Sequence, residues 1–160
     1  MSKEKAKRQL NKWMQEDYWV KYAETQYRFV SKKIIAEEYL GENLLTYRFC
    51  CFGGEPRLIY LMTEKPDITY VDYYDTEWKK LDYRWAGMEW DPNPVVKPER
   101  LEEMLETARA LSKGFPFVRI DLYNVDGRVY LSEFTFLPAA GIMKFSDKRV
   151  ARKLGSWIEI

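Results

Sequence analysis

The sequence predicts an α+β domain, built mostly from an antiparallel sheet with flanking helices. Short apolar stretches separated by turn residues recur through the middle of the chain, as expected for strands that are joined by hairpins. Only one segment there, residues 99–113, has the apolar spacing of a helix, so helices and strands do not alternate regularly. Aromatic residues make up 16% of the 160 residues, which suits a sheet with large half-buried surfaces.

The first half of the chain is predicted to contain one helix and five strands. Residues 3–17 have apolar side chains at helical spacing, and the mixed segment that follows them is not assigned. Apolar runs bounded by turn residues predict strands at 34–40, 45–52, 56–63, 68–75 and 78–83. The second and third of these strands form a hairpin across Gly53 and Gly54.

The second half is predicted to hold two helices on either side of a hairpin. Pro98 and Gly114 flank a helix over 99–113, and Ser146 is the expected N-cap of a last helix over 146–158. Between the helices, residues 117–136 (FVRIDLYNVDGRVYLSEFTF) read as two strands joined by a tight turn.

The turn of this last hairpin decides which side chains share a face. Residues 124–127 (NVDG) fit a three-residue turn with a bulge, because Asn favours the first turn position and Gly the fourth. Arg119 then lies opposite Glu133, and Asp121 lies opposite Leu131. The competing two-residue Asp-Gly turn shifts the register by one residue and puts Asp121 and Glu133 on opposite faces.

The first register is preferred because it separates polar from apolar side chains. The expected core face carries Val118, Ile120, Leu122, Tyr130, Ser132, Phe134 and Phe136. The other face carries Arg119, Asp121, Tyr123, Val129, Leu131, Glu133 and Thr135. One interpretation is an ordinary cross-strand pair of Arg119 and Glu133, worth about 0.2–1 kcal/mol, with Asp121 solvated. The other is a cation between the two carboxylates, such as Mg²⁺, beside an arginine that contacts a transferring phosphoryl group.

Composition argues against several other functions. The formal net charge is +1, so we expect neither a nucleic-acid partner nor general binding to membrane surfaces. No apolar run approaches the roughly 20 residues of a membrane span, and the charged start is not a signal peptide, so a cytoplasmic protein is expected. Histidine is absent, which leaves only hard, oxygen-bound metals. Cys50 and Cys51 are adjacent on an expected strand, which disfavours a disulfide or a metal cluster.

Two further motifs have competing interpretations. Residues 34–40 (IIAEEYL) are either an apolar strand that ends in charged residues, or a strand end whose backbone reads an adenine edge. Residues 52–54 (FGG) are a hairpin turn without a following helix, so no Gly-rich phosphate loop is recognised.

Three stretches together resemble the ATP-grasp superfamily. They are IIAEEYL, TYRFCCFGGEPRLIYL and FPFVRIDLYNVDGRVYLSEFTFLPAAG. More specifically, they resemble the TupA-like ATP-grasp proteins, which are found with cell-surface polysaccharide and teichuronopeptide biosynthesis. The specific part is the last hairpin, where Arg-x-Asp on one strand is followed by Glu-x-Thr on the next and by a turn similar to Pro-Gly. The likeness extends over nearly the whole chain.

The resemblance implies roles for individual residues. The adenine-binding hinge falls on Glu37, Glu38, Tyr39 and Leu40. The metal ligands fall on Asp121, Glu133 and Thr135. Arg119 falls on an arginine that contacts a phosphate or an acyl phosphate, and Arg48 falls where the family often has lysine. The implied cofactors are ATP and Mg²⁺, and the implied activity is Mg-ATP-dependent carboxylate–amine ligation on a small carboxylate or glycan-linked substrate.

The departures from the family pattern point to a partial domain. The resemblance covers the C-terminal half of an ATP-grasp domain, without the lysine-bearing strand and the Gly-rich loop. Thr46 replaces a usual acidic residue, and PAAG replaces a more glycine-rich turn. We therefore expect residues 1–160 to form a single partial ATP-grasp domain with weak nucleotide binding.

Three functions remain open at this stage. The first is a ligase, or half of one whose partner chain supplies the missing half. The second is a catalytically inactive ATP-grasp-fold module, used for binding or interaction, from a truncated gene. The third is a glycosyltransferase-like role in glycan assembly.

Overall fold

The structure, a computed structural model, describes residues 2–159. The chain divides into two compact units, Met1–Tyr39 and Leu40–Ile160, and each is described by itself. In the part of the chain that is described, no helix is long and apolar enough to cross a membrane. The expectation of one partial ATP-grasp domain stays a prediction.

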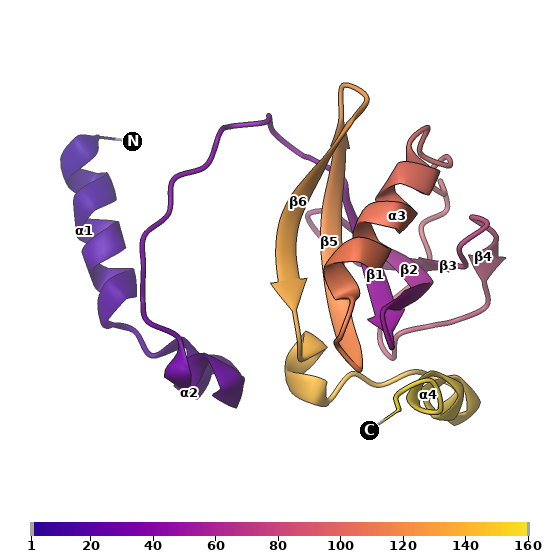
Figure 1. The fold of residues 1–160 in the computed structure, drawn as a ribbon. Coiled ribbons are helices and arrows are strands. Elements are labelled where there is room, and N and C mark those ends of the chain that lie inside the picture. Colours follow the sequence, from indigo (N-terminus) through magenta and orange to yellow (C-terminus); the bar gives the residue numbers. More distant parts are fainter. Residues whose placement is uncertain (1, 160) are drawn as a thin grey trace. The chain divides into compact units, whose positions relative to one another are not determined.

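The first unit contains three short helical segments and no buried residue among 2–39. They are α1 (Lys3–Gln15), α2 (Tyr18–Tyr22) and the 3-10 helix η1 (Thr25–Phe29). The predicted first helix is confirmed, and Ser2 caps it by accepting a hydrogen bond from the backbone N–H of Lys5. After η1 the chain returns beside α1 (Figure 1). Trp13 and Ile35 line the same hollow.

The strand predicted at residues 34–40 is wrong. The structure gives this segment no regular secondary structure, and most of its side chains are exposed. A strand needs the backbone of a neighbouring strand to satisfy its N–H and C=O groups, and no strand pairs with this segment in the described chain. The local pattern of apolar and β-branched residues was therefore insufficient.

The second unit is built on one six-stranded antiparallel sheet in the order β4-β3-β2-β1-β5-β6. The strands are β1 (Thr46–Phe52), β2 (Glu55–Glu64), β3 (Thr69–Tyr74), β4 (Lys80–Leu81), β5 (Phe117–Val125) and β6 (Arg128–Thr135). The helices are α3 (Leu101–Ser112), the 3-10 helix η2 (Pro138–Gly141) and α4 (Lys148–Gly155). These strands confirm the α+β class and the six predicted strands after residue 44, although β4 is shorter than expected.

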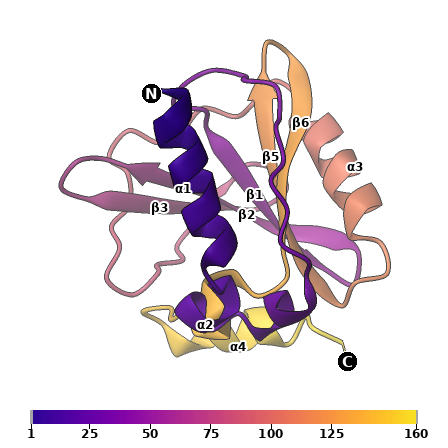
Figure 2. The ribbon, with the colours of Figure 1, turned by 90° about the vertical axis from the view of Figure 1, so that its left-hand side faces the viewer.

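The two faces of the sheet bury separate apolar clusters. On one face, α3 packs across the strands (Figures 1 and 2). Its Met104 and Ala108 share a buried cluster with Phe49 and Ile120 of the sheet. On the other face, α4 contributes to a second cluster, which includes Tyr60, Tyr73, Val150 and Leu154. Helix α4 is shorter than predicted, and its N-cap is Asp147 rather than Ser146.

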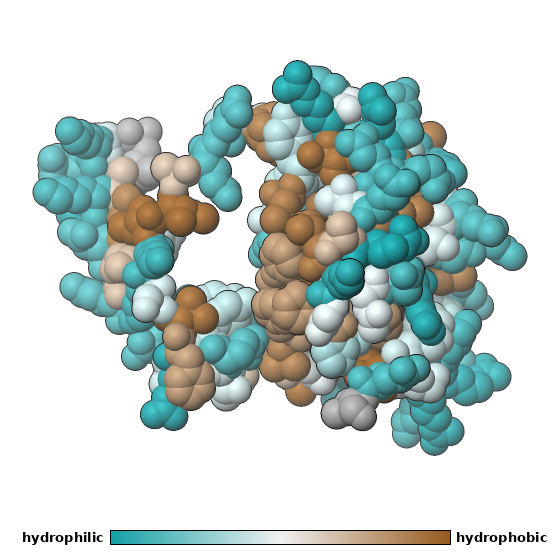
Figure 3. Space-filling view, viewed as in Figure 1, coloured by the Kyte–Doolittle hydropathy of each residue, from teal (hydrophilic) through white to brown (hydrophobic). Residues whose placement is uncertain are grey.

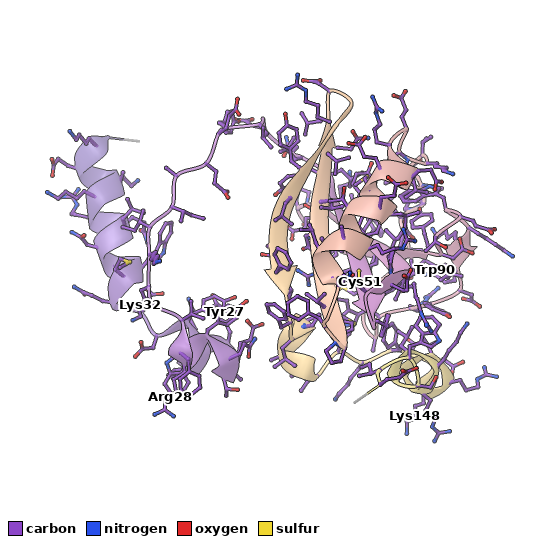
Figure 4. All side chains as sticks on the ribbon, in the orientation of Figure 1. Tyr27, Arg28, Lys32, Cys51, Trp90 and Lys148 are labelled. Carbon is purple, nitrogen blue, oxygen red and sulfur yellow. The ribbon has the colours of Figure 1, made fainter. Side chains whose placement is uncertain are left out.

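The adjacent cysteines lie on opposite faces, as the sequence predicts. Cys50 belongs to the cluster beside α4, whereas Cys51 lies beneath α3, with Sγ 3.9 Å from the carbonyl oxygen of Ala108 (Figure 4). Both are buried and free. No group of three or more His, Cys, Asp or Glu within residues 2–159 could hold a metal ion.

The register predicted for the last hairpin is wrong, because the chain uses the two-residue turn. Val125 pairs with Arg128, and both Asp126 and Gly127 have positive φ, as a type I′ turn requires. This turn shifts Val129 and Leu131 to the α3 side of the sheet, where Val129 packs against the core. Tyr130 moves to the opposite side, where it faces Tyr123.

A bulge restores the polar face that the predicted register was chosen to explain. The register shifts between Asp121 and Leu122, so that Leu131 faces Leu122 but Glu133 faces Asp121. Ser132 is the extra residue on β6, and an extra residue reverses the alternation of side chains beyond it. Asp121 and Glu133 therefore share a face despite the two-residue turn.

Strand β6 forms one edge of the sheet, and part of it is apolar. Leu131 and the following Phe136 are exposed large hydrophobic residues. Figure 3 shows a brown hydrophobic band along this edge of the second unit. The polar side chains of β6 thus lie on the face of the sheet that carries α4, beside a mostly apolar edge.

Candidate active site

The five residues predicted on strands are brought together on one face of the sheet. Arg48 of β1 pairs with Asp121 of β5, and Asp121 pairs in turn with Glu133 of β6. Arg119 is two residues before Asp121 and pairs with Thr135. Since cross-strand partners point to the same side of a sheet, three neighbouring strands place all five side chains together.

Arg119 and Asp121 form the centre of this charged cluster. The Nε of Arg119 donates to Asp121 Oδ1 at 2.6 Å, and its Nη2 donates to Oδ2 at 2.7 Å. Such a fork-to-carboxylate contact fixes both groups in orientation as well as in distance. The Asp121 residue is only 2% exposed, so the expected solvated aspartate is wrong. The Nε of Arg48 lies 3.6 Å from Asp121 Oδ2 and adds a second positive charge.

The same guanidinium also reaches the second carboxylate. Arg119 Nη2 donates to Glu133 Oε1 at 2.6 Å, so the ion pair of the simpler interpretation is present. The two residues are diagonal neighbours across the strands rather than directly opposite each other. Thr135 Oγ1 donates to the same oxygen at 2.8 Å. The Glu133 side chain is 57% exposed, whereas that of Arg119 is only 11% exposed. One arginine therefore joins a buried carboxylate to a carboxylate at the surface.

Tyr60 on β2 is a member of the cluster that the sequence did not reveal. Its hydroxyl accepts a hydrogen bond of 3.0 Å from Arg119 Nη1. The guanidinium carbons of Arg48 and Arg119 lie 5.7 and 5.9 Å from the centre of its ring, within cation–π range. The pairing of Tyr60 with Arg48 could have indicated this position, but a register irregularity at Cys50/Cys51 hides it from simple alternation.

Burial and charge act in opposite directions on the ionisation of the cluster. Burial raises the pKa of the Asp121 carboxyl, while the guanidinium groups of Arg119 and Arg48 lower it in part. Burial opposes the charge of Arg119, but the hydrogen bonds and the negative charge of Asp121 outweigh this cost and raise the pKa of the guanidinium. The raised pKa favours the charged form of the arginine.

An apolar cavity of about 280 Å³ lies next to the charged cluster. It is lined by residues of the sheet, η2 and α4, and Tyr60 and Cys50 belong to both its lining and the neighbourhood of Arg119. The Tyr60 side chain therefore lies between the Arg119 guanidinium and the apolar cavity. A poorly polarisable surrounding of this kind strengthens the attraction between the charges beside it.

The arrangement of the two carboxylates does not fit a bound Mg²⁺. Both oxygens of Asp121 accept hydrogen bonds from Arg119, and Glu133 Oε1 already accepts two. Magnesium needs oxygen ligands at about 2.0–2.1 Å in near-octahedral geometry. Arg119 occupies the space between the carboxylates that such an ion would need. This geometry does not support the metal-ligand roles of Asp121, Glu133 and Thr135, which stay a prediction.

The residues of the expected adenine hinge lie at the boundary between the two units. Glu37, Glu38 and Tyr39 are exposed and end the first unit, whereas Leu40 is half-buried and begins the second. Their role in nucleotide binding also stays a prediction.

A comparison of the sequence with known families shows which family the chain belongs to. The sequence matches the TupA-like ATPgrasp family over residues 2–159, and the chain belongs to that family. Comparisons with curated proteins and with solved structures gave no match. The resemblance based on three sequence stretches is thereby confirmed, and the family as a whole indicates use of ATP and Mg²⁺.

Proposed function

We propose that the chain is an ATP-grasp-type carboxylate–amine ligase, or half of one, that acts in cell-surface polysaccharide biosynthesis. The observation that supports this proposal is the gathering of Arg48, Arg119, Asp121 and Glu133 on one sheet face of an ATP-grasp family member. Guanidinium groups fixed in this way can bind phosphoryl oxygens, and they stabilise the charge that develops during phosphoryl transfer.

In this proposal the carboxylate substrate attacks the γ-phosphorus of ATP, which gives an acyl phosphate and ADP. An amine then attacks the carbonyl carbon, and inorganic phosphate leaves with the electron pair of the broken C–O bond. Arg119 contacts the transferred phosphoryl group. Asp121 orients the Arg119 guanidinium through the two hydrogen bonds described above. Arg48 adds positive charge from the neighbouring strand.

Trapping with hydroxylamine tests this activity without knowledge of the natural amine. The chain is incubated with Mg-ATP, hydroxylamine and a pool of small carboxylates, and ADP and hydroxamates are measured. A ligase forms both products in the presence of a carboxylate, and Arg119→Gln abolishes both because the phosphoryl contact is lost. Arg57→Gln, on an exposed position of β2, is the matched control and keeps the activity. Absence of both products from a folded chain would contradict a complete ligase and would leave half of a ligase or the module without catalysis.

The second candidate is an ATP-grasp-fold module without catalysis. It is favoured by the fact that Arg119 is already engaged by Asp121, Glu133 and Tyr60. For the isolated chain we predict poor ATP binding, with a dissociation constant in the millimolar range or no binding, equivalent to about −4 kcal/mol or weaker. Calorimetric titration with Mg-ATP measures this, and a micromolar dissociation constant would show that the chain contains a complete nucleotide site.

A further inference from the structure

The position between the carboxylates of Asp121 and Glu133 is held by a single nitrogen atom. Arg119 Nη2 lies 2.7 Å from Asp121 Oδ2 and 2.6 Å from Glu133 Oε1. These two oxygens belong to different strands, so Nη2 is the atom that joins them. A cation that bridged the same pair of oxygens would have to lie at or beside the same place.

Arg119 is also fixed in this position from its other nitrogens. Nε donates to Asp121 Oδ1 and Nη1 donates to the hydroxyl of Tyr60, so each nitrogen of the guanidinium makes a hydrogen bond. Tyr60 and Asp121 are almost completely buried. Because these partners are buried, their hydrogen-bonding groups are fixed in place. The Arg119 guanidinium would lose these hydrogen bonds if it moved away from them.

The charges of the cluster already balance without any metal. Two guanidinium groups, from Arg48 and Arg119, face two carboxylates, from Asp121 and Glu133. A divalent cation added to this set would meet two like charges within the cluster. Such repulsion disfavours binding, and it is strongest beside the buried Asp121.

We infer that the Arg119 guanidinium and a divalent cation are mutually exclusive occupants of the Asp121–Glu133 pair, and that the guanidinium is the resident occupant. Metal binding then requires Arg119 to leave the pair. The ligand-free chain is therefore insensitive to divalent cations, even though it carries two carboxylates side by side. This inference does not depend on the proposed ligase activity.

The test is a titration of the full chain with Mn²⁺. The electron paramagnetic resonance signal of the free ion measures how much Mn²⁺ is bound. We expect no binding to the parent chain below millimolar Mn²⁺. Arg119→Gln removes the resident charge and should bind Mn²⁺ at least tenfold more tightly. This threshold is conservative, because the repulsion between two positive unit charges about 4 Å apart near a protein surface corresponds to a roughly thousandfold change in binding.

Two further variants distinguish the effect of the group that lies between the carboxylates from the effect of the net charge of the cluster on Mn²⁺ binding. Arg48→Gln removes the same charge from the cluster but leaves Nη2 between the carboxylates, so it should bind Mn²⁺ no better than the parent chain. The double change Arg119→Gln with Glu133→Gln should lose the gained binding, because only one carboxylate remains. Equal gains in the Arg48 and Arg119 variants would overturn the inference, since charge alone would then explain them.

The test remains decisive even if Arg119→Gln does not fold. Submillimolar Mn²⁺ binding by the parent chain, abolished by Glu133→Gln, would overturn the inference directly. In addition, Arg119→Lys keeps the charge but replaces the planar fork by a single ammonium group, which cannot hold both carboxylates in the same way. This variant should bind Mn²⁺ more tightly than the parent, and unchanged binding would contradict mutual exclusion.

Discussion

The two hairpins β1–β2 and β5–β6 are built alike but have different roles. Each has a two-residue turn with positive φ at both positions, Gly53-Gly54 in the first and Asp126-Gly127 in the second. Each also has one register irregularity along its length. The first hairpin lies in the middle of the sheet and is buried on both faces, whereas the second ends at the edge strand β6.

The comparison indicates that the position of a hairpin in the sheet decides whether its side chains are apolar or charged. The central strands β1 and β2 have covered faces on both sides, so most of their side chains are apolar. At the edge, one strand is open to water, so the Glu133 side chain is more than half exposed while its partner Asp121 is buried. The charged cluster therefore spans the boundary between the central strands and the edge.

Alkaline pH should have the largest effect, and it should act through the central hairpin. Burial raises the pKa of Cys50 from 9.0 to about 12 and that of Cys51 to about 11, and it also raises the pKa of Tyr60. A raised pKa gives stability that is complete below the unfolded value and is lost as pH rises through the folded value. The free energy of unfolding should thus fall between about pH 9 and pH 12, where the unfolded thiols release their protons first.

Urea unfolding at a series of pH values measures this alkaline loss. Cys50→Ala removes one of the titrating groups and should flatten the slope between pH 9 and pH 12, relative to the parent chain. An unchanged slope in that variant would show that the Cys50 thiol is not held neutral by burial.

Truncation of the central hairpin should have the next largest effect. Ile59 on β2 is fully buried in the cluster beneath α3, so Ile59→Ala should lower the free energy of unfolding by about 2–5 kcal/mol. Val129→Ala on β6 is the matched control, because Val129 is only partly buried against the same cluster. Urea unfolding of both variants measures the difference, and equal losses would remove the distinction between the centre and the edge.

Removal of the buried charge in the cluster should have a smaller but clear effect. Asp121→Asn leaves Arg119 and Arg48 without their buried counter-charge, so we expect a loss of about 1.5–3 kcal/mol, as for hydrogen bonds to charged groups. Thermal unfolding in the presence of a chelator measures this loss. Unchanged or increased stability would show instead that the two carboxylates repel each other in the parent chain.

The matching change on the edge strand should have the smallest effect. Glu133→Gln keeps an oxygen that accepts hydrogen bonds from Arg119 and Thr135, and it removes only a charge that is more than half exposed. The expected loss is below about 1 kcal/mol, which is typical of exposed ion pairs. If chelator melts gave equal losses for the changes at Asp121 and Glu133, burial would not be the factor that separates these partners.

Much of the fold could be predicted because local patterns agree with the final packing. The helices α1 and α3 and the strands from β1 onward follow from periodicity and from Gly, Pro and Asp at their ends. The segment 34–40 has the composition of a strand, but a strand exists only where another strand supplies hydrogen bonds. That information lies in the tertiary structure and not in the segment.

The candidate site was predicted for a partly incorrect reason. The three-residue turn was preferred because it separates polar from apolar side chains, which also places Asp121 and Glu133 on one face. The chain brings these two residues together with a two-residue turn and an extra Ser132 instead. Polarity along a strand shows which side chains share a face, but it cannot distinguish two combinations of turn and bulge that give the same grouping. Tyr60 was missed because its strand is not adjacent to Arg119 in the sequence or in the sheet.

The absence of any buried residue among 2–39 determines what each kind of experiment can detect. Cooperative melting reports on surface that is buried in the folded state, so the transitions described above come from residues 40–159. Isolated helices shorter than about 12–15 residues are marginal in water, and α1 lies near this limit. Its amide protons should therefore exchange with solvent far faster than those of β1. Residue-resolved hydrogen exchange, rather than a melting curve, is the measurement that would register a ligand at Glu37 to Tyr39.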